Sequence, residues 1–97
     1  MIVQRRTWKI KQGCMQELVA LGNSFIETTG STVRLYTPRM GLGRHDTLVA
    51  DHEFESLAEM ESFWKEWLAR PDAPAFQEKW DALTERGGSG EIWNLVD

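Results

Sequence analysis

The chain has 97 residues, of which 41% are hydrophobic and 27% are charged, and its formal net charge is −4. This length accommodates one domain, residues 1–97, whose single core is adequate but small. No apolar run approaches the roughly 20 residues of a membrane span, and the acidic balance argues against general affinity for phosphate backbones. We therefore expect neither a membrane protein nor a nucleic-acid-binding protein.

The lone cysteine, Cys14, excludes an intramolecular disulfide and fits a reducing compartment. Arg5 and Arg6 are followed by the mixed run 7–11 (TWKIK) instead of an apolar signal core, which disfavours secretion. We expect a cytoplasmic protein. Cys14 stands at the start of a predicted helix near Lys11, where the helix dipole could lower its pKa, but packing as a small side chain is the commoner role of such a cysteine.

Charge is unevenly distributed along the chain. Residues 1–50 hold seven Lys or Arg against three acids (+4), and residues 51–97 hold four against twelve (−8). More solvated helix surface in the second half explains this asymmetry simply. The sharper interpretation is an anion-binding pocket among the arginines of the first half, namely Arg5, Arg6, Arg34 and Arg39.

Alternation and helical spacing predict the elements of the first half. Residues 2–10 alternate as a strand, with one face formed by Ile2, Gln4, Arg6, Trp8 and Ile10 and the other by Val3, Arg5, Thr7 and Lys9. Apolar residues at helical spacing predict a helix over 14–28 that stops at Gly30. Strands are predicted over 31–37 and 45–55, joined by a glycine-containing hairpin connection at 40–44.

The second half begins with a capping box at Ser56 and Glu59, in which the serine hydroxyl accepts from the Glu59 amide and the glutamate reaches back to the Ser56 amide. Pro71 ends this helix, and Asp72 with Pro74 indicates the N-cap and first turn of a second helical segment. A last short strand is predicted over 91–96. Three tryptophans at helical spacing are expected to be core residues, namely Trp64, Trp67 and Trp80.

The resulting order is β-α-β-β-α-β, with the second helix in two segments. With right-handed crossovers it favours an α+β fold of the ferredoxin-like type, a four-stranded antiparallel sheet with the helices on one face. The other face is left without a cover, and Trp8 and Trp93 offer more aromatic surface than two short helices readily bury. We therefore expect a symmetric homodimer that packs sheet against sheet.

Three segments carry a family resemblance. Residues 6–13 (RTWKIKQG) resemble the first-strand signature of NIPSNAP-like proteins, residues 53–59 (EFESLAE) resemble that family's entry into its second helix, and residues 71–76 (PDAPAF) resemble its later break before an aromatic helix. The resemblance implies membership of the dimeric α+β barrel superfamily. Relatives use a central cavity for cofactor-free oxygenation, haem degradation, lactone isomerisation or no known chemistry, so the resemblance does not select a reaction.

His52 is the best candidate for a catalytic acid or base, because imidazole titrates near neutral pH. It shares a strand face with Leu48, Ala50 and Phe54, and this parity favours a partly buried core histidine over a catalytic one. We expect no metal site, since His45 and His52 point to opposite faces of one strand.

Arg6 beside Trp8 is a candidate clamp for a carboxylate or phenolate, with Arg34 and Tyr36 contributing from the next strand and Asn94 from the last. A dimer contact or a surface arginine is the alternative for Arg6. Two functions follow. The first is a homodimer that binds or transforms a small apolar or aromatic ligand without a tightly bound cofactor, like a cofactor-free monooxygenase. The second is a non-enzymatic dimerisation or protein-interaction module of NIPSNAP type.

Overall fold

A computed structural model describes residues 1–39 and 46–96 of the chain, and the hairpin connection predicted at 40–44 lies outside them, as does His45. The elements in chain order are β1 (Ile2–Lys9), α1 (Met15–Thr29), β2 (Arg34–Tyr36), β3 (Thr47–Phe54), α2 (Leu57–Leu68), α3 (Ala73–Leu83) and β4 (Ser89–Asn94). The four strands form one antiparallel sheet in the order β2-β3-β1-β4. This is the ferredoxin-like α+β arrangement predicted from the sequence.

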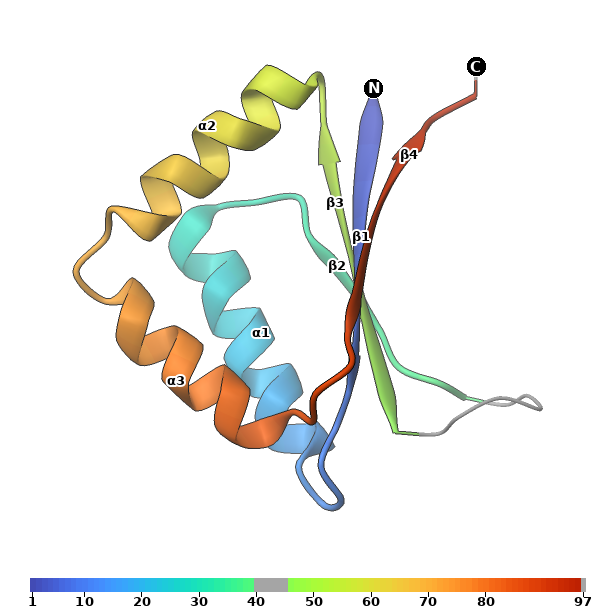
Figure 1. Ribbon diagram of the computed structural model, residues 1–97, viewed down its shortest axis with the longest axis vertical. Coiled ribbons are helices and arrows are strands. Elements are labelled where there is room, and N and C mark those ends of the chain that lie inside the picture. Colours follow the sequence, from blue (N-terminus) through green and yellow to red (C-terminus); the bar gives the residue numbers. More distant parts are fainter. Residues whose placement is uncertain (40–45, 97) are drawn as a thin grey trace.

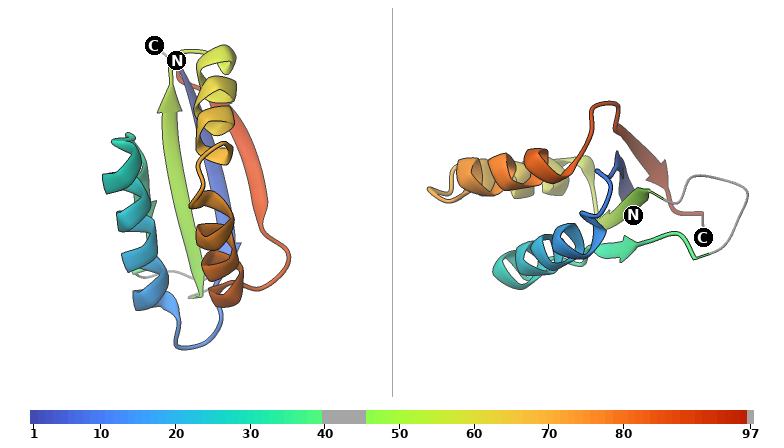
Figure 2. Two further views of the ribbon diagram at one scale, coloured as in Figure 1. Left: turned by 90° about the vertical axis from the view of Figure 1, so that its left-hand side faces the viewer. Right: turned by 90° about the horizontal axis from the view of Figure 1, so that it is seen from below.

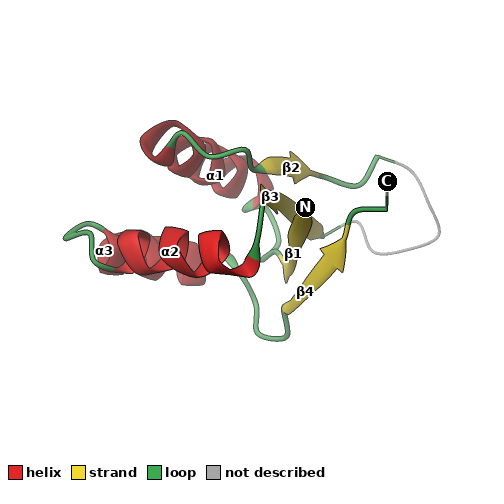
Figure 3. Cartoon of the chain, turned by 90° about the horizontal axis from the view of Figure 1, so that it is seen from above, coloured by secondary structure: helices red, strands yellow, loops and turns green. Residues whose placement is uncertain are grey.

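The molecule has two layers, and all three helices lie on one face of the sheet (Figure 1). Figure 2 shows α1 along one side of this layer, and α2 and α3 in line along the other. The edge strand β4 lies beyond the helices in the same view. Seen from above, the strands leave their second face uncovered by any described element (Figure 3). We call it the open face.

The central strand β1 pairs with β3 on one side and β4 on the other. Its alternation separates the two faces as predicted, because successive side chains of a strand point to opposite sides. Trp8 points to the helix side, where its ring meets that of Trp80 edge to face with centroids 4.9 Å apart. Trp8 therefore belongs with the core beneath the helices, which is built around Ile10, Leu18, Leu48 and Trp80.

The predicted ends of α1 and α2 are confirmed, with one change of partner. Gly30 caps α1 in the left-handed conformation (φ 64°), and its amide donates to the Ile26 carbonyl. At α2 the Glu59 amide donates to the Ser56 hydroxyl over 3.2 Å. The Glu59 carboxylate accepts from the amide of Glu55 at 2.9 Å, one residue before the predicted donor.

The second helical segment, α3, also begins where the sequence predicts, with a proline in its first turn. Asp72 occupies the N-cap position, but its side chain makes no cap hydrogen bond. Its carboxylate instead pairs with the guanidinium of Arg70, 2.9 Å away.

β2 is shorter than the predicted strand at 31–37, because it pairs only with β3 at the edge of the sheet, over three residues. No helix in the described part of the chain is long and apolar enough to cross a membrane.

Candidate functional site

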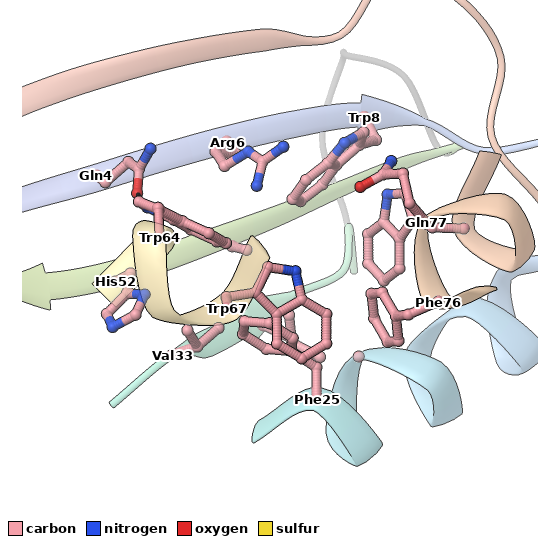
Figure 4. Close-up of a pocket in the computed structure, with 14 residues that line it drawn as sticks. Gln4, Arg6, Trp8, Phe25, Val33, His52, Trp64, Trp67, Phe76 and Gln77 are labelled. Carbon is pink, nitrogen blue, oxygen red and sulfur yellow. Dashed lines mark hydrogen bonds between the residues drawn. The ribbon is translucent and has the colours of Figure 1, made fainter. Parts of the chain in front are cut away.

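A cavity lies between the sheet and the helices, and its walls are largely aromatic (Figure 4). The cavity is partly open to solvent and has a volume of about 70 Å³. β1 contributes the polar side chains of Gln4 and Arg6, and β3 contributes His52. β1 also contributes Trp8, and the remaining walls come from all three helices and from β2 with the residue before it, including Phe25, Val33, Leu35, Trp64, Trp67, Phe76 and Gln77.

Arg6 is a positive charge held between two indole rings. Its guanidinium carbon lies 5.0 Å from the ring centroid of Trp8 and 5.3 Å from that of Trp64, both within cation–π range. Gln4 fixes the second ring, since its Oε1 accepts a 2.7 Å hydrogen bond from the Trp64 indole N–H. These contacts orient the guanidinium toward the cavity.

No acidic side chain within the described ranges pairs with Arg6. Burial lowers the pKa of Arg6 from its usual value, because removing water penalises the charged form. An arginine nevertheless stays protonated in proteins. The cavity therefore contains a permanent cation that contacts two indole rings and has no acidic partner among the described residues.

His52 lies deeper, with 6% of its surface exposed. Its imidazole stacks on Phe54 at 3.9 Å and meets Phe63 edge to face at 4.5 Å. Burial lowers the pKa of His52 from 6.5 to about 4, an effect that the negative charge of Glu59 only partly offsets. The ring is therefore neutral at physiological pH, and its Nδ1 has no hydrogen-bond partner among the residues that the structure describes.

His52 also lines a second hollow, of about 360 Å³. The walls of this hollow combine phenylalanines with serine, threonine and three glutamates, Glu53, Glu59 and Glu66. Within residues 1–39 and 46–96, no group of three or more histidine, cysteine or acidic side chains could hold a metal ion. The predicted buried position of His52 is confirmed, and its side chain lines both the aromatic cavity and the acidic hollow.

The structure brings together three of the predicted site residues, Arg6, Trp8 and His52. Arg34 and Tyr36 lie on the open face, since they pair in register with Asp51 and Val49. They cannot reach Arg6 through the sheet.

The other candidates also lie away from the cavity. Asn94 is exposed at the end of the edge strand β4 and lines neither cavity. Of the four arginines considered for an anion-binding pocket, Arg5 pairs with Asp51 on the open face and Arg39 is an exposed residue after β2. Only Arg6 enters the cavity.

Sequence reasoning assigned the tryptophans of the helices to packing, and Trp67 and Trp80 are indeed buried. It missed the position of Trp64, which is half-exposed, lines the cavity and contacts Arg6. It also missed Gln4. The alternation of β1 could have indicated Gln4, because it placed Gln4, Arg6 and Trp8 on one face of the strand.

The fold matches those of solved structures. An uncharacterised NIPSNAP domain protein from Burkholderia xenovorans superposes with a TM-score of 0.82 at 17% identity, covering 99% of this chain and 95% of that one. A NIPSNAP family protein from Agrobacterium tumefaciens gives a TM-score of 0.81 at 19% identity, with 99% and 86% covered. A protein described as an antibiotic biosynthesis monooxygenase gives 0.72 at 14% identity over the whole of both chains.

These likenesses establish a fold shared with NIPSNAP-domain and antibiotic biosynthesis monooxygenase proteins. No protein-family model and no curated protein sequence matches the chain significantly.

Proposed function

We propose that this chain forms a homodimer in which each subunit binds a small aromatic compound with one anionic group, without a tightly bound cofactor. The observation that carries the ligand proposal is Arg6, a permanent cation between Trp8 and Trp64 with no acidic partner in the described residues. A ligand carboxylate or phenolate would supply the missing charge, and its ring would contact the indoles.

The balance of chemical groups in the cavity favours such a ligand. Withdrawing a charge from water is costly unless an opposite charge or hydrogen bonds replace the lost solvation, and the rings provide only part of this replacement. Gln4 and Gln77 offer amide groups near the same walls. A neutral apolar ligand would leave Arg6 uncompensated, whereas an anionic one would satisfy it.

The size of the cavity has a further consequence. At about 70 Å³, the cavity is smaller than the roughly 150 Å³ of an engineered apolar cavity that admits benzene. An aromatic ligand would therefore displace part of the wall. Trp64 is the residue best placed to move, since it is half-exposed and its indole makes a single hydrogen bond in the described part of the chain, to Gln4.

Binding is better supported than acid–base catalysis. A histidine whose pKa is about 4 is a weak base, and the Nδ1 of His52 is buried among phenylalanine rings. Activity of the monooxygenase type would have to draw its chemistry from the substrate and oxygen, with Arg6 stabilising an anionic form of the substrate.

NMR titration of the protein with benzoate and 2-naphthoate tests the ligand proposal, with benzyl alcohol and 2-naphthalenemethanol as neutral analogues. We expect the anions to shift the indole N–H signals of Trp8 and Trp64 and to bind more tightly than the alcohols. Arg6→Met should weaken binding of the anions roughly 10- to 100-fold through loss of a charge-assisted contact. Arg86→Ala removes an exposed arginine and should change nothing.

Equal binding of acids and alcohols, or the absence of binding by both acids, would contradict the ligand proposal. So would an Arg6→Met variant that binds the anions as tightly as the unchanged protein.

The homodimer is supported by the open face, where Trp93 and Tyr36 leave 51% and 47% of their surfaces exposed. Exposed aromatic residues on an uncovered sheet face are typical of an interface. Light scattering at micromolar concentration measures the assembly directly, and a monomer there would contradict this part of the proposal.

A further inference from the structure

Three residues that line the cavity stand side by side across the sheet. The strand register pairs Arg6 of β1 with Ala50 of β3, and Ala50 with Leu35 of β2. Directly paired residues of antiparallel strands point to the same side of the sheet, and all three line the cavity. They therefore form a row across the sheet side of the cavity, which we call the floor row. Because neighbouring strands lie about 4.8 Å apart, the backbones at its two ends are about 10 Å apart.

The floor row changes in character from one end to the other. Arg6 supplies a positive charge between the rings of Trp8 and Trp64. Ala50 has only a methyl group, so the middle of the row is lower than both ends. Leu35 places an apolar side chain at the far end, on the edge strand of the sheet. An aromatic acid matches this order of groups, because its carboxylate and its apolar ring lie at opposite ends of the molecule.

Gly22 of α1 forms the wall next to Leu35. It is buried and lines the cavity. A β-carbon added to Gly22 would lie 2.8 Å from Cδ1 of Leu35 and 3.7 Å from Cζ3 of Trp80. Since two carbon atoms in favourable contact are about 3.5 to 4.0 Å apart, the first distance is a clash. The Leu35 side chain therefore occupies a notch that exists only because residue 22 has no side chain.

The backbone of α1 does not itself require a glycine at this position. Gly22 has no positive φ, and it lies inside a 15-residue helix, where alanine is the better helix former. What Gly22 provides is space, and the group that uses this space is the end of a flexible leucine side chain. Since Leu35 also borders the cavity, the notch keeps part of that side chain out of the cavity.

We propose that the ligand lies across the strands along the floor row, and that Gly22 and Leu35 limit the length of its ring system. This inference rests on the anionic aromatic ligand proposed above and specifies how that ligand lies. The carboxylate contacts Arg6, the ring passes over Ala50, and the far edge of the ring meets Leu35. A larger residue at position 22 would expel Leu35 from the notch into the cavity, so that only shorter acids fit.

Binding of benzoate and 2-naphthoate to a set of variants, measured by NMR titration, tests this arrangement. Gly22→Ala should weaken binding of 2-naphthoate about tenfold or more and that of benzoate less than about threefold, because only the longer acid reaches Leu35. The double variant Gly22→Ala/Leu35→Val should recover binding of 2-naphthoate, since valine lacks the carbon that clashes. Ala50→Leu raises the middle of the row and should weaken binding of both acids about tenfold or more.

Asn23→Ala is the matched control. It also introduces alanine into α1, but at an exposed position next to Gly22, and it should leave both dissociation constants unchanged.

The outcomes separate this inference from the proposed ligand class. If neither acid binds to the unchanged protein, the ligand proposal is wrong. If both acids bind and Gly22→Ala weakens them equally or not at all, Gly22 serves packing only, and the proposed orientation alone is wrong. Failure of the double variant to recover 2-naphthoate binding would also overturn the orientation.

Circular dichroism checks that each variant is folded. Should Gly22→Ala misfold, Leu35→Ala carries the test, because it lengthens the space at the far end of the row. This variant should bind 2-naphthoate more tightly relative to benzoate than the unchanged protein does, and an unchanged ratio of the two dissociation constants would overturn the inference.

Discussion

His52 shows how its surroundings change the chemistry of one side chain. In the sequence it was the best acid or base candidate, and in the structure it is a neutral ring stacked on Phe54 and closed off by Phe63. Strand parity predicted this burial, since alternate residues of β3 face the helices. The parity could not predict the unsatisfied Nδ1, which depends on aromatic residues that α2 brings to the site.

The lowered pKa of His52 makes stability depend on pH. The unfolded chain binds this proton with a pKa of 6.5, whereas the folded chain binds it with a pKa of about 4. The free energy of unfolding should therefore be highest above pH 6.5 and fall as the pH drops toward 4, with a loss of about 2 kcal/mol between pH 7 and pH 5. Urea unfolding at the two pH values measures this difference.

Two substitutions isolate the contribution of His52 to this pH dependence. His52→Phe keeps an aromatic ring in the stack and should remove about 2 kcal/mol of the difference in unfolding free energy between pH 7 and pH 5. His45→Gln replaces the chain's other histidine and should retain the difference. An unchanged difference in His52→Phe would show that other groups cause it.

At the scale of single elements, two helix starts that look alike in sequence are stabilised differently. Ser56 accepts a hydrogen bond from the backbone of α2, whereas Asp72 at the start of α3 makes none. Arg70 lies two residues before Asp72, and its guanidinium donates two hydrogen bonds to the Asp72 carboxylate. A charged side chain close in sequence thus competes with the helix amides for the capping group.

Ser56→Ala should consequently lower the free energy of unfolding by about 1 kcal/mol, since it leaves the Glu59 amide without its acceptor. Asp72→Ala should have a much smaller effect, because it removes only an exposed ion pair. Chemical denaturation of both variants gives the comparison, and equal losses would mean that Asp72 caps α3 in solution.

The elements of the fold could be predicted from the sequence, whereas contacts between them could not. Local signals predicted the seven elements, the Gly30 stop and the two faces of β1, because periodicity and capping depend on residues a few positions apart. The contact between Arg6 and Trp64 joins positions 58 residues apart, and no periodicity records such a pairing. For the same reason Arg34 and Tyr36 were grouped with Arg6, because chain order alone does not align the faces of neighbouring strands.

At the scale of the whole molecule, the described elements cover the sheet on one side only. Trp93 and Ile92 are neighbours on β4 and are similarly exposed, at 51% and 52%. They point to opposite sides of the sheet, since Trp93 pairs with Val3 and Ile92 with Gln4. Ile92 is exposed although it faces the helix side, because β4 lies beyond the helices (Figure 2).

These neighbours provide a matched test of which surface assembles. Trp93→Ser should weaken the proposed dimer at least tenfold, because it removes a large aromatic residue from the open face. Ile92→Ser removes a similarly exposed apolar side chain from the helix side of the sheet and should leave the dimer unchanged. Sedimentation velocity across a concentration series measures how strongly each variant dimerises. If only Ile92→Ser dissociated the dimer, the interface would lie on the helix side of the sheet, and the proposal would be wrong.

Arg5 and Arg6 are adjacent in the chain, yet one pairs with Asp51 on the open face and the other enters the cavity. A single strand thus encodes two surfaces in alternating positions. Substituting even-numbered residues of β1 changes the cavity and leaves the composition of the open face as it is. Substituting odd-numbered residues changes the open face and leaves the cavity as it is. Inserting one residue into β1 would exchange the two sets and disrupt both surfaces, so the scaffold is easy to diversify by substitution and intolerant of insertion there.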